Sequence, residues 1–459
     1  MRIILEIPLR ISEICHAVGA PQRKYSQAST TVSALCTDTR ECCEQDLFIA
    51  LDGEKTSGEN YVSEALVKKC CVISKSDRPD VIRVNDTAEA LLKIAALYKS
   101  KFDLKHVVAV TGSVGKSTTV KFISEILSTK YRVHSPIKNY NNHIGVPLTV
   151  LAMPRDTEVL VIELGMNHRG EISRLSRCIQ PDVALITIIG SAHIGNLGSR
   201  GEIAQAKLEI LDGMKDGLLF LPYNEPLLAK NKNALFVARN SSLSDISLDN
   251  LTANTYSFKS DLGIIEGFTF FDSREHLLYD LALAISVAQR LGLSEEEIIK
   301  GIGAITAANL RQRLIVLNSF TIFDDSYNAS LESISADLDF LRSLNTPTSA
   351  FLGDVLELGK NTIDIHIQIG RSAARSGISR LYLYGEYAEY TAKGAMLEGM
   401  DKERIFINTD LSAPEISVEQ IKRNHIPGET ILFKASHRLR LDKIADLFEK
   451  GERMHNDKQ

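Results

Sequence analysis

The sequence predicts an α/β fold built mainly on parallel sheets. Short apolar segments rich in Val and Ile alternate with longer stretches of helical periodicity, a pattern typical of successive βαβ units. One of these apolar segments leads directly into a glycine-rich loop, which an amphipathic helix follows. The length of 459 residues indicates several domains, since a domain commonly has about 100–200 residues.

The predicted elements can be placed in order along the chain. We expect strands at VVAV (107–110), VLVIEL (159–164), VALITII (183–189), LIVL (314–317), FTIFDD (320–325) and ILFK (431–434). We expect helices at 87–100, 116–128, 202–213, 275–292 and 331–343. GIGA (301–304) is interpreted as a helix end, because it lacks the third glycine of a dinucleotide-binding loop. These elements suggest three zones, at residues 1–104, 105–310 and 311–459.

Composition narrows the class of protein. Apolar residues make up 44% of the chain and charged residues 24%, as in an ordinary globular protein. The net charge of −5 argues against a general nucleic-acid-binding surface, and no apolar run approaches the ~18 residues of a membrane helix. The N-terminus, MRIILEIPLR, is a poor signal peptide, and the cysteines lack CxxC spacing. We therefore expect a cytoplasmic protein with reduced thiols, no nucleic-acid partner and no membrane insertion.

The glycine-rich loop is the strongest functional signal. TGSVGKST comprises Thr111, Gly112, Ser113, Val114, Gly115, Lys116, Ser117 and Thr118. A strand–loop–helix unit directs backbone N–H groups and a helix N-terminus at one point, which suits a phosphate. Lys116 can neutralise phosphate charge, and the Ser117 hydroxyl can bind Mg²⁺. The alternative is a tight strand-to-helix turn with a chance Lys-Ser; we predict an ATP or GTP site.

Three further side chains are candidates for the same site. Glu163 ends a predicted strand, where ligands of an open α/β sheet collect, and can hold Mg²⁺ opposite Ser117. Its alternative role is a core carboxylate satisfied by nearby donors. His193 follows the next strand and is either a second metal ligand or a structural histidine. Lys207, in a predicted helix, would by itself be taken for a solvated lysine.

Two polar loops complete the set of candidates. KNYNNHIGVP (138–147) gathers Asn139, Asn141 and Asn142 in a loop that can bind polar substrate groups. FDDSYNAS (323–330) places Asp324, Asp325, Tyr327 and Asn328 at a strand-to-helix turn. That turn is either a helix N-cap or a loop that contacts the nucleotide. GDVLELG (353–359) ends a further predicted strand, with His366 beyond it.

Taken together and in this order, the segments resemble the Mur ligase family. The resemblance rests on TDTREC and DLFIALDGEKTSGENYV (within 37–62), VVAVTGSVGKST (107–118), NYNNHIGVPLTVL (139–151), VIELGMNHRGEI (161–172), AHIGNLGS and AKLEIL (within 192–211), DDSYNAS (324–330), GDVLELG (353–359) and FKASHRLRLDKI (433–444). It implies three domains: an N-terminal UDP-sugar-binding domain, a central P-loop ATPase-like domain with a parallel sheet, and a C-terminal Rossmann-like domain. We assign these to the three zones above.

The two asparagine-containing strings are most similar to family members that extend a UDP-N-acetylmuramoyl-tripeptide with D-alanyl-D-alanine. For these members the resemblance implies that ATP phosphorylates the terminal carboxylate of the tripeptide. The dipeptide amine then attacks the acyl phosphate, in the cytoplasmic stage of peptidoglycan precursor synthesis. It implies small-molecule substrates, and we expect a monomer. The alternatives are a folylpolyglutamate- or cyanophycin-type ligase, or an ATP-binding protein without ligase chemistry.

The resemblance also assigns roles to individual residues. Ser117, Glu163 and His193 match metal-site positions, and Lys207 matches a lysine that family members carry as a carbamate able to bind a second Mg²⁺. Tyr327 and Asn328 match a nucleotide loop, and either Arg311 or Arg313 matches an arginine near the nucleotide. Thr39 and Arg40 match the UDP-sugar site. Asn141 and Asn142 are expected to contact substrate.

Overall fold

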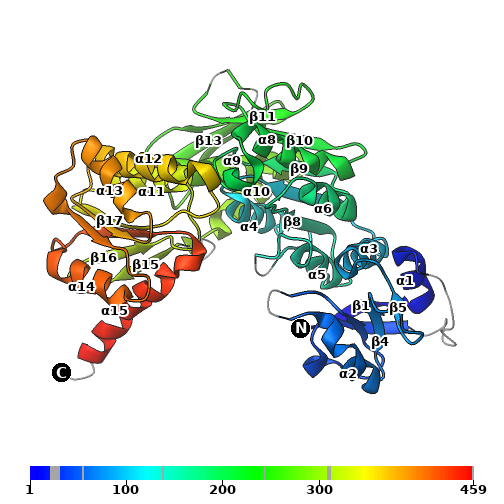
Figure 1. The fold of residues 1–459 in the computed structure, drawn as a ribbon. Coiled ribbons are helices and arrows are strands. Elements are labelled where there is room, and N and C mark those ends of the chain that lie inside the picture. Colours follow the sequence, from blue (N-terminus) through cyan, green and yellow to red (C-terminus); the bar gives the residue numbers. More distant parts are fainter. Residues whose placement is uncertain are drawn as a thin grey trace.

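The structure, a computed structural model, describes residues 1–20, 31–53, 56–136, 139–241, 243–244, 246–307 and 312–456. Its strands form three sheets of five, nine and six strands, which follow one another along the chain. Figure 1 shows the first and third sheets, with their helices, attached to opposite sides of the middle one. The predicted α/β fold with mainly parallel sheets is confirmed.

The first sheet has the spatial order β1-β2-β3-β4-β5, with an antiparallel pair β1/β2 and parallel pairs thereafter. Its elements are β1 (Arg2–Arg10), α1 (Ile11–Val18), β2 (Thr31–Cys36), η1 (Thr39–Glu41), β3 (Leu47–Ile49), η2 (Gly58–Tyr61), α2 (Val62–Val67), β4 (Cys71–Ser74), β5 (Ile82–Arg83) and α3 (Thr87–Lys99). Helix α3 packs against α1 and also against two helices of the middle sheet, α5 and α6. The first and second sheets therefore share one apolar core.

The nine-stranded sheet has the order β14-β13-β12-β11-β10-β9-β6-β8-β7. Its elements are β6 (His106–Thr111), α4 (Lys116–Leu127), β7 (Val133–His134), α5 (Gly145–Leu151), β8 (Val159–Glu163), α6 (Glu171–Ile179), β9 (Val183–Ile186), α7 (Ile194–Leu197), α8 (Arg200–Leu208), η3 (Glu209–Gly213), β10 (Leu218–Pro222), β11 (Leu235–Arg239), β12 (Ile246–Asn250), β13 (Thr255–Ser260), β14 (Gly263–Thr269), α9 (Glu275–Arg290) and α10 (Glu295–Ala304). GIGA ends α10, as predicted. The antiparallel edge β12–β14 was not predicted.

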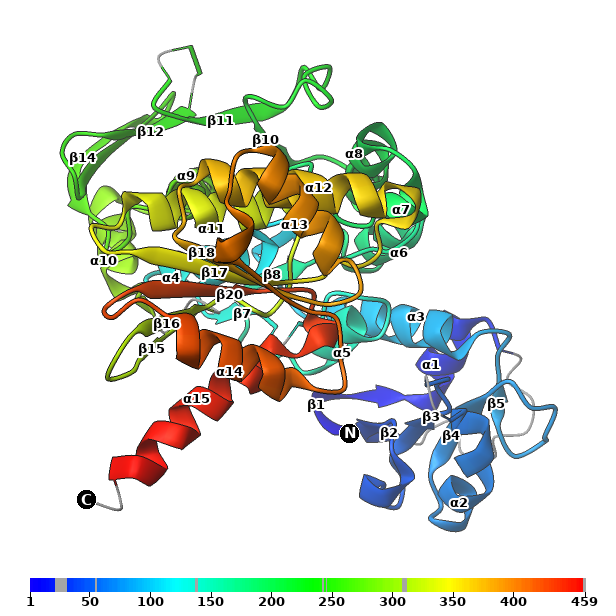
Figure 2. The same ribbon diagram turned by 60° about the vertical axis from the view of Figure 1, so that its left-hand side comes forward.

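The third sheet has the order β15-β16-β20-β17-β18-β19, and only the edge pair β15/β16 is antiparallel among its described strands. Its elements are β15 (Arg313–Val316), β16 (Thr321–Asp324), α11 (Leu331–Ser343), β17 (Thr348–Gly353), η5 (Gly359–Asn361), α12 (Thr362–Arg375), β18 (Arg380–Tyr384), α13 (Ala388–Leu397), η6 (Lys402–Arg404), β19 (Ile405–Asn408), α14 (Pro414–Asn424), β20 (Thr430–Lys434), η7 (His437–Leu439) and α15 (Leu441–Asn456). Separate apolar clusters fill its two faces. The ribbon in Figure 2 shows α11–α13 and α14–α15 on opposite faces.

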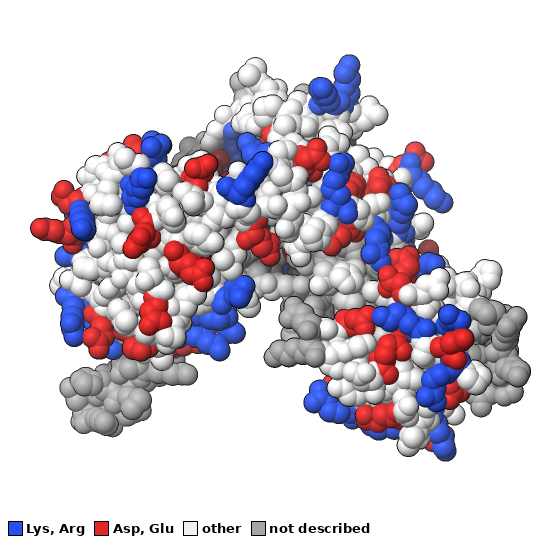
Figure 3. Space-filling view, viewed as in Figure 1, with Lys and Arg blue, Asp and Glu red and all other residues white. Residues whose placement is uncertain are grey.

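The molecular surface mixes charges of both signs. In Figure 3 positive and negative side chains alternate over all three domains, and the face is hollowed between the first and third domains. Among the described residues, no helix combines the length and apolar character needed to cross a bilayer. All seven cysteines are free thiols, and five of them are buried.

Candidate active site

The phosphate loop lies where β6, β8 and β9 end side by side. Strand β6 pairs in parallel with both β8 and β9, so the loop faces the carboxyl ends of all three strands. Gly112 (φ +154°) and Gly115 (φ +86°) adopt backbone conformations that favour glycine. Gly115 is also the N-cap of α4 and supplies no side-chain cap. The helix N-terminus therefore faces the loop, as an anion site requires.

Two residues far away in sequence hold this loop in place. A Cβ on Gly112 would lie 1.9 Å from Thr187 Oγ1, and a Cβ on Gly115 would lie 2.7 Å from Asp280 Oδ1. The Thr187 hydroxyl donates to the Val114 carbonyl, and Thr119 Oγ1 donates to Asp280 at 2.8 Å. Burial raises the pKa of Asp280 well above its usual range, while its bond to Thr119 opposes that shift. Thr187 and Asp280, which the sequence analysis did not single out, therefore constrain the loop and the start of α4.

Two lysines meet at one backbone oxygen of the loop. Lys116 Nζ lies 3.0 Å and Lys207 Nζ lies 2.8 Å from the Gly112 carbonyl oxygen. Lys207 extends from the last turn of α8 and is only 2% exposed, so it is not a solvated helix lysine. Burial lowers the pKa of Lys207 well below its usual range; Lys116 lowers it further, and Glu163 opposes the shift. Burial and the charge of Lys116 therefore favour the neutral form of the Lys207 amine.

Glu163 and Ser117 bring a carboxylate and a hydroxyl together beside the phosphate loop. Glu163 ends β8, is 5% exposed and accepts a hydrogen bond from the Ser117 hydroxyl. Asn141 Nδ2 donates to its other carboxylate oxygen at 2.7 Å. A carboxylate and a hydroxyl are the hard oxygen ligands that Mg²⁺ prefers, so this pair fits the ion.

His193 follows the end of β9, at the edge where the loop lies, but its side chain contacts the third domain. Its Nδ1 lies 2.6 Å from Oε2 of Glu357, which follows β17, and this bond lowers the pKa of Glu357. Within the described residues, no hydrogen bond or ion pair joins His193 to Glu163, and no cluster of three His, Cys, Asp or Glu side chains forms a metal site. The predicted role of His193 as a metal ligand stays a prediction.

The candidate nucleotide loop of the third domain also reaches the central domain. The side chain of Tyr327 bonds to Asn139, and its ring centroid lies 5.4 Å from that of His437. Asn328 is exposed beside it. Arg313 is bound to Asp324, with its Nε at 2.8 Å from the carboxylate, whereas Arg311 lies outside the described residues.

The predicted substrate residues lie in two different environments. Asn141 contacts Glu163, but the Asn142 side chain accepts from the backbone N–H groups of Ile144 and Gly145, at the start of α5. In the first domain, η1 turns the exposed Arg40 outward, where it pairs with Asp38 at 2.6 Å. Thr39 is buried on the same turn, and its carbonyl accepts from Lys68. The structure therefore places Thr39 and Arg40 in a different domain from the phosphate loop, whereas Asn141 lies beside that loop.

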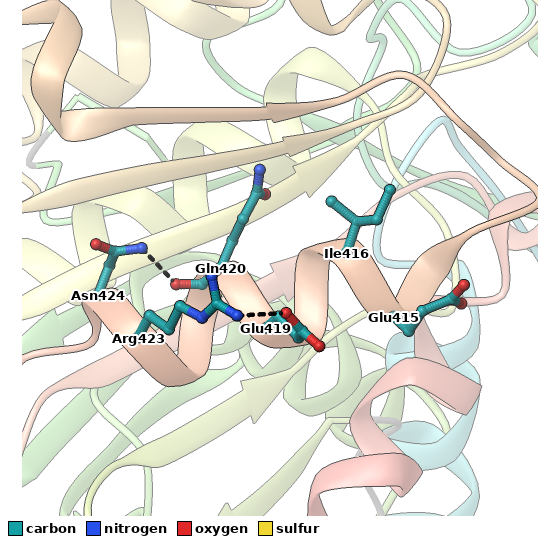
Figure 4. A pocket seen from close by; sticks show the side chains of 6 residues that line it. All are labelled: Glu415, Ile416, Glu419, Gln420, Arg423 and Asn424. Atoms are coloured by element: carbon teal, nitrogen blue, oxygen red, sulfur yellow. Dashed lines mark hydrogen bonds and ion pairs between the residues drawn. The ribbon is translucent and has the colours of Figure 1, made fainter.

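One hollow of the surface lies elsewhere, on α14 (Figure 4). Its lining residues belong to a single helix and bond within it: Arg423 pairs with Glu419 at 2.9 Å, and the Asn424 side chain donates to the backbone carbonyl of Gln420 at 2.8 Å. None of the predicted site residues lines it.

Comparison with known proteins identifies the family. The family model of the Mur ligase middle domain matches residues 110–276. The chain is 36% identical over 441 residues to the UDP-N-acetylmuramoyl-tripeptide–D-alanyl-D-alanine ligase of Bacillus subtilis, covering 93% of this chain and 95% of that one. It is 30% identical to the protein of that name from Synechocystis, over 90% of this chain and 91% of the relative.

Solved structures agree with this result. The crystal structure of MurF from Acinetobacter baumannii matches 97% of this chain and 100% of its own, with a TM-score of 0.85 and 27% identity. The structure of MurF from Thermotoga maritima in complex with ADP shares the fold, with a TM-score of 0.79 and 24% identity over 92% of this chain and 98% of its own. The predicted three-domain architecture is confirmed. The chain belongs to the Mur ligase family, in its MurF branch.

Proposed function

We propose that this protein is an ATP-dependent amide ligase that joins D-alanyl-D-alanine to UDP-N-acetylmuramoyl-tripeptide during peptidoglycan precursor synthesis. Relatives that match more than nine-tenths of this chain carry the name of that reaction. The observation that carries the proposal is the meeting of Lys116, Lys207, Ser117 and Glu163 around one phosphate loop. Such an arrangement suits transfer of a phosphoryl group to an acid.

The reaction needs an activated acid because a carboxylate is a poor electrophile. In the first step, a carboxylate oxygen of the tripeptide forms a bond to the γ-phosphorus of ATP, and the bond to the bridging oxygen breaks to release ADP. The dipeptide amine then attacks the carbonyl carbon of the acyl phosphate. The tetrahedral intermediate expels phosphate and loses the amine proton, which leaves an amide.

Residues of the phosphate loop have defined tasks in this scheme. The backbone of residues 111–118 and the start of α4 bind the phosphates, and Lys116 offsets their charge. Ser117 and Glu163 would hold Mg²⁺, with His193 as a further ligand. A bound Mg²⁺ supplies charge neutralisation for the transferring phosphoryl group. Tyr327, Asn328 and either Arg311 or Arg313 would contact the nucleotide.

Lys207 has the chemistry of a carbamylation site. A neutral amine is nucleophilic, and burial, which lowers the pKa of Lys207, favours that form. Attack of Nζ on carbon dioxide forms an N–C bond and releases a proton, so that an anion replaces the amine. That anion would face Lys116 and a second Mg²⁺. We propose that the active enzyme carries this carbamate.

The remaining assignments concern substrate binding, the cellular compartment and the oligomeric state. Thr39 and Arg40 would bind the UDP-sugar part of the acceptor, and Asn141 and Asn142 would line the path to the phosphate loop. ATP and UDP-linked sugars are cytoplasmic, so we infer a cytoplasmic enzyme. One chain carries every residue named here, and we infer that it works as a monomer.

Phosphate release from ATP and Mg²⁺ tests the proposal directly. We expect release only when both the tripeptide nucleotide and D-alanyl-D-alanine are present, with a pentapeptide product by mass. The assay should use tripeptides ending in L-lysine and in meso-diaminopimelate. Activity with glutamate or aspartate acceptors instead would favour a folylpolyglutamate- or cyanophycin-type ligase. ATP binding without turnover in any mixture would favour a non-catalytic protein.

Lys116→Ala is the matched control. It should abolish phosphate release and leave thermal unfolding unchanged, because Lys116 acts on the phosphates. Unchanged turnover in this variant would contradict the phosphate-loop assignment.

A further inference from the structure

A contact between two domains involves a predicted metal ligand. His193 precedes α7 of the central domain, and Glu357 precedes η5 of the third domain. His193 Nδ1 lies 2.6 Å from Glu357 Oε2, and the backbone N–H of Gly195 donates to the Glu357 carbonyl at 3.0 Å. Figure 2 shows α7 beside the end of α12 to which η5 leads. The two domains therefore contact each other here through a side-chain pair and a backbone hydrogen bond.

The backbone at both residues of this contact adopts a conformation that is uncommon for non-glycine residues. His193 (φ +64°) and Glu357 (φ +63°) are both non-glycine residues in the left-handed region, which only a few per cent of such residues occupy. A Cβ on Gly195 would lie 2.5 Å from the Gly359 nitrogen and 2.6 Å from the Glu357 oxygen. Such conformations persist only where the surroundings hold them, and they concentrate at functional sites.

The chemistry of the contact defines which nitrogen of His193 is available. A carboxylate that accepts a hydrogen bond from Nδ1 favours the tautomer with the ring proton on Nδ1. The lone pair of Nε2 is then available to a metal ion. Histidine ligands of metals regularly have such a carboxylate on their second nitrogen, which fixes the ring and increases its basicity.

We propose that Glu357 is a positioning residue supplied by the third domain, which orients His193 toward the divalent metal ion of the ligation site. The inference rests on the proposed function, in which His193 binds that ion. Since Glu357 belongs to another domain, the metal site is complete only while the third domain is docked as it is here. Metal binding and domain docking consequently favour one another.

A second carboxylate of the third domain offers a matched control. Glu332, in α11, accepts from the backbone N–H of Ser191 at 2.8 Å and from its hydroxyl at 3.0 Å. It joins the same two domains two residues before His193, but it contacts no histidine among the described residues. Removing Glu332 therefore loosens docking without changing the ring of His193.

The test uses Mn²⁺ and a non-hydrolysable ATP analogue with the full-length chain, and electron spin echo spectroscopy to detect a histidine nitrogen on Mn²⁺. The wild-type chain and E332Q should show the nitrogen signal, and H193A should lose it. We expect Mn²⁺ to bind about 10- to 100-fold more weakly in E357A, with a weakened nitrogen signal. E357Q, which keeps an acceptor oxygen, should fall between E357A and the wild type.

Equal effects of E357A and E332Q would overturn the proposal, because Glu357 would then be only a docking contact. A nitrogen signal that persists in H193A would overturn it too, since no ligand would need positioning. The spectroscopic arms require no peptide substrate. Failure of the proposed function would instead appear as phosphate release that does not depend on D-alanyl-D-alanine in the wild-type chain.

Discussion

Lys207 and Lys434 are equally buried, at 2% exposure, yet their surroundings give them opposite chemistry. Lys434 ends β20 in the third domain and forms ion pairs with Asp325 and with Asp337, the latter at 2.8 Å. Burial lowers the pKa of Lys434, but the two carboxylates outweigh it and raise that pKa above its usual range. Burial lowers the pKa of Lys207 as well, but here Lys116 lowers it further, and the opposing influence of Glu163 does not restore it.

The difference shows that partners, and not depth, decide whether a buried lysine keeps its charge. A buried charge needs compensation, and a carbonyl oxygen gives much less of it than two carboxylates. Lys434 is therefore a charged structural centre that joins β20 to the DDSYNAS turn. Lys207 lies beside the phosphate loop, where burial favours the neutral form of its amine. Four experiments test this difference between the two lysines.

The largest effect on the free energy of unfolding should follow removal of the Lys434 amine. Lys434→Met leaves the carboxylates of Asp325 and Asp337 buried without their cation, so we expect unfolding to cost about 3–5 kcal/mol less. Urea unfolding at pH 8 measures this loss. Lys207→Met is the control and should not destabilise the chain, because it removes an amine that burial disfavours. Equal stability losses in the two variants would refute the comparison.

For ligase activity, in contrast to stability, we expect the large effect at Lys207. Lys207→Ala should reduce ligation about 100- to 1000-fold, the range seen when one preorganised charge-stabilising group is removed. Added bicarbonate should not restore turnover, because no amine remains to be carbamylated. Dipeptide-dependent phosphate release is the measurement, with thermal unfolding as the check that the variant is folded. Near-normal turnover would make Lys207 a structural residue.

The pH dependence of stability should separate the lysines further. The pKa of Lys207 is lower in the folded than in the unfolded chain, so the unfolded chain binds the extra proton and stability rises with pH. Between pH 7.5 and 9.5 we expect the wild type to gain up to ~1.4 kcal/mol per pH unit relative to Lys207→Met. Denaturant unfolding in buffer depleted of carbon dioxide gives the slope. Parallel curves would contradict the lowered pKa.

The smallest effect belongs to Asp337. Burial, with Asp325 adding to it, raises the pKa of Asp337 to about 7, so the contribution of this residue to stability is greatest at acidic pH and falls as pH rises toward 7. Because Asp337 titrates together with its partners, we expect a fall of roughly 0.5 kcal/mol per pH unit. Asp337→Asn should remove this fall, which unfolding between pH 5 and 7 can detect. A slope retained in that variant would place the titration elsewhere.

Local signals made much of the fold predictable. The strand before the phosphate loop, the loop and the helix after it were predicted within two residues, because apolar period, glycine and helix start lie together in sequence. The antiparallel edge β12–β14 was missed, since its strands ISLDN, TYSFKS and GIIEGFT mix polar and apolar residues and contain no long apolar run. Helix 331–343 was predicted to the residue, and Ser330 caps it.

The site was harder to predict because its partners are distant in sequence. Thr187, Asp280 and Glu357 lie 73 to 164 residues from the groups they contact, and nothing local marks them. The helical pattern around Lys207 suggests a solvated lysine, and only packing beneath the loop buries it. Asn142 was predicted to contact substrate, but its side chain accepts from the backbone N–H groups of Ile144 and Gly145, where α5 starts.

The apolar core shared by the first two sheets has a consequence for synthesis on the ribosome. Helix α3 buries Leu91 and Ile94 against a core that also contains Leu148 and Leu175. When the first hundred residues have emerged, the partners of that helix face are still untranslated. The apolar face of α3 therefore stays exposed to solvent and chaperones until α5 and α6 have been synthesised.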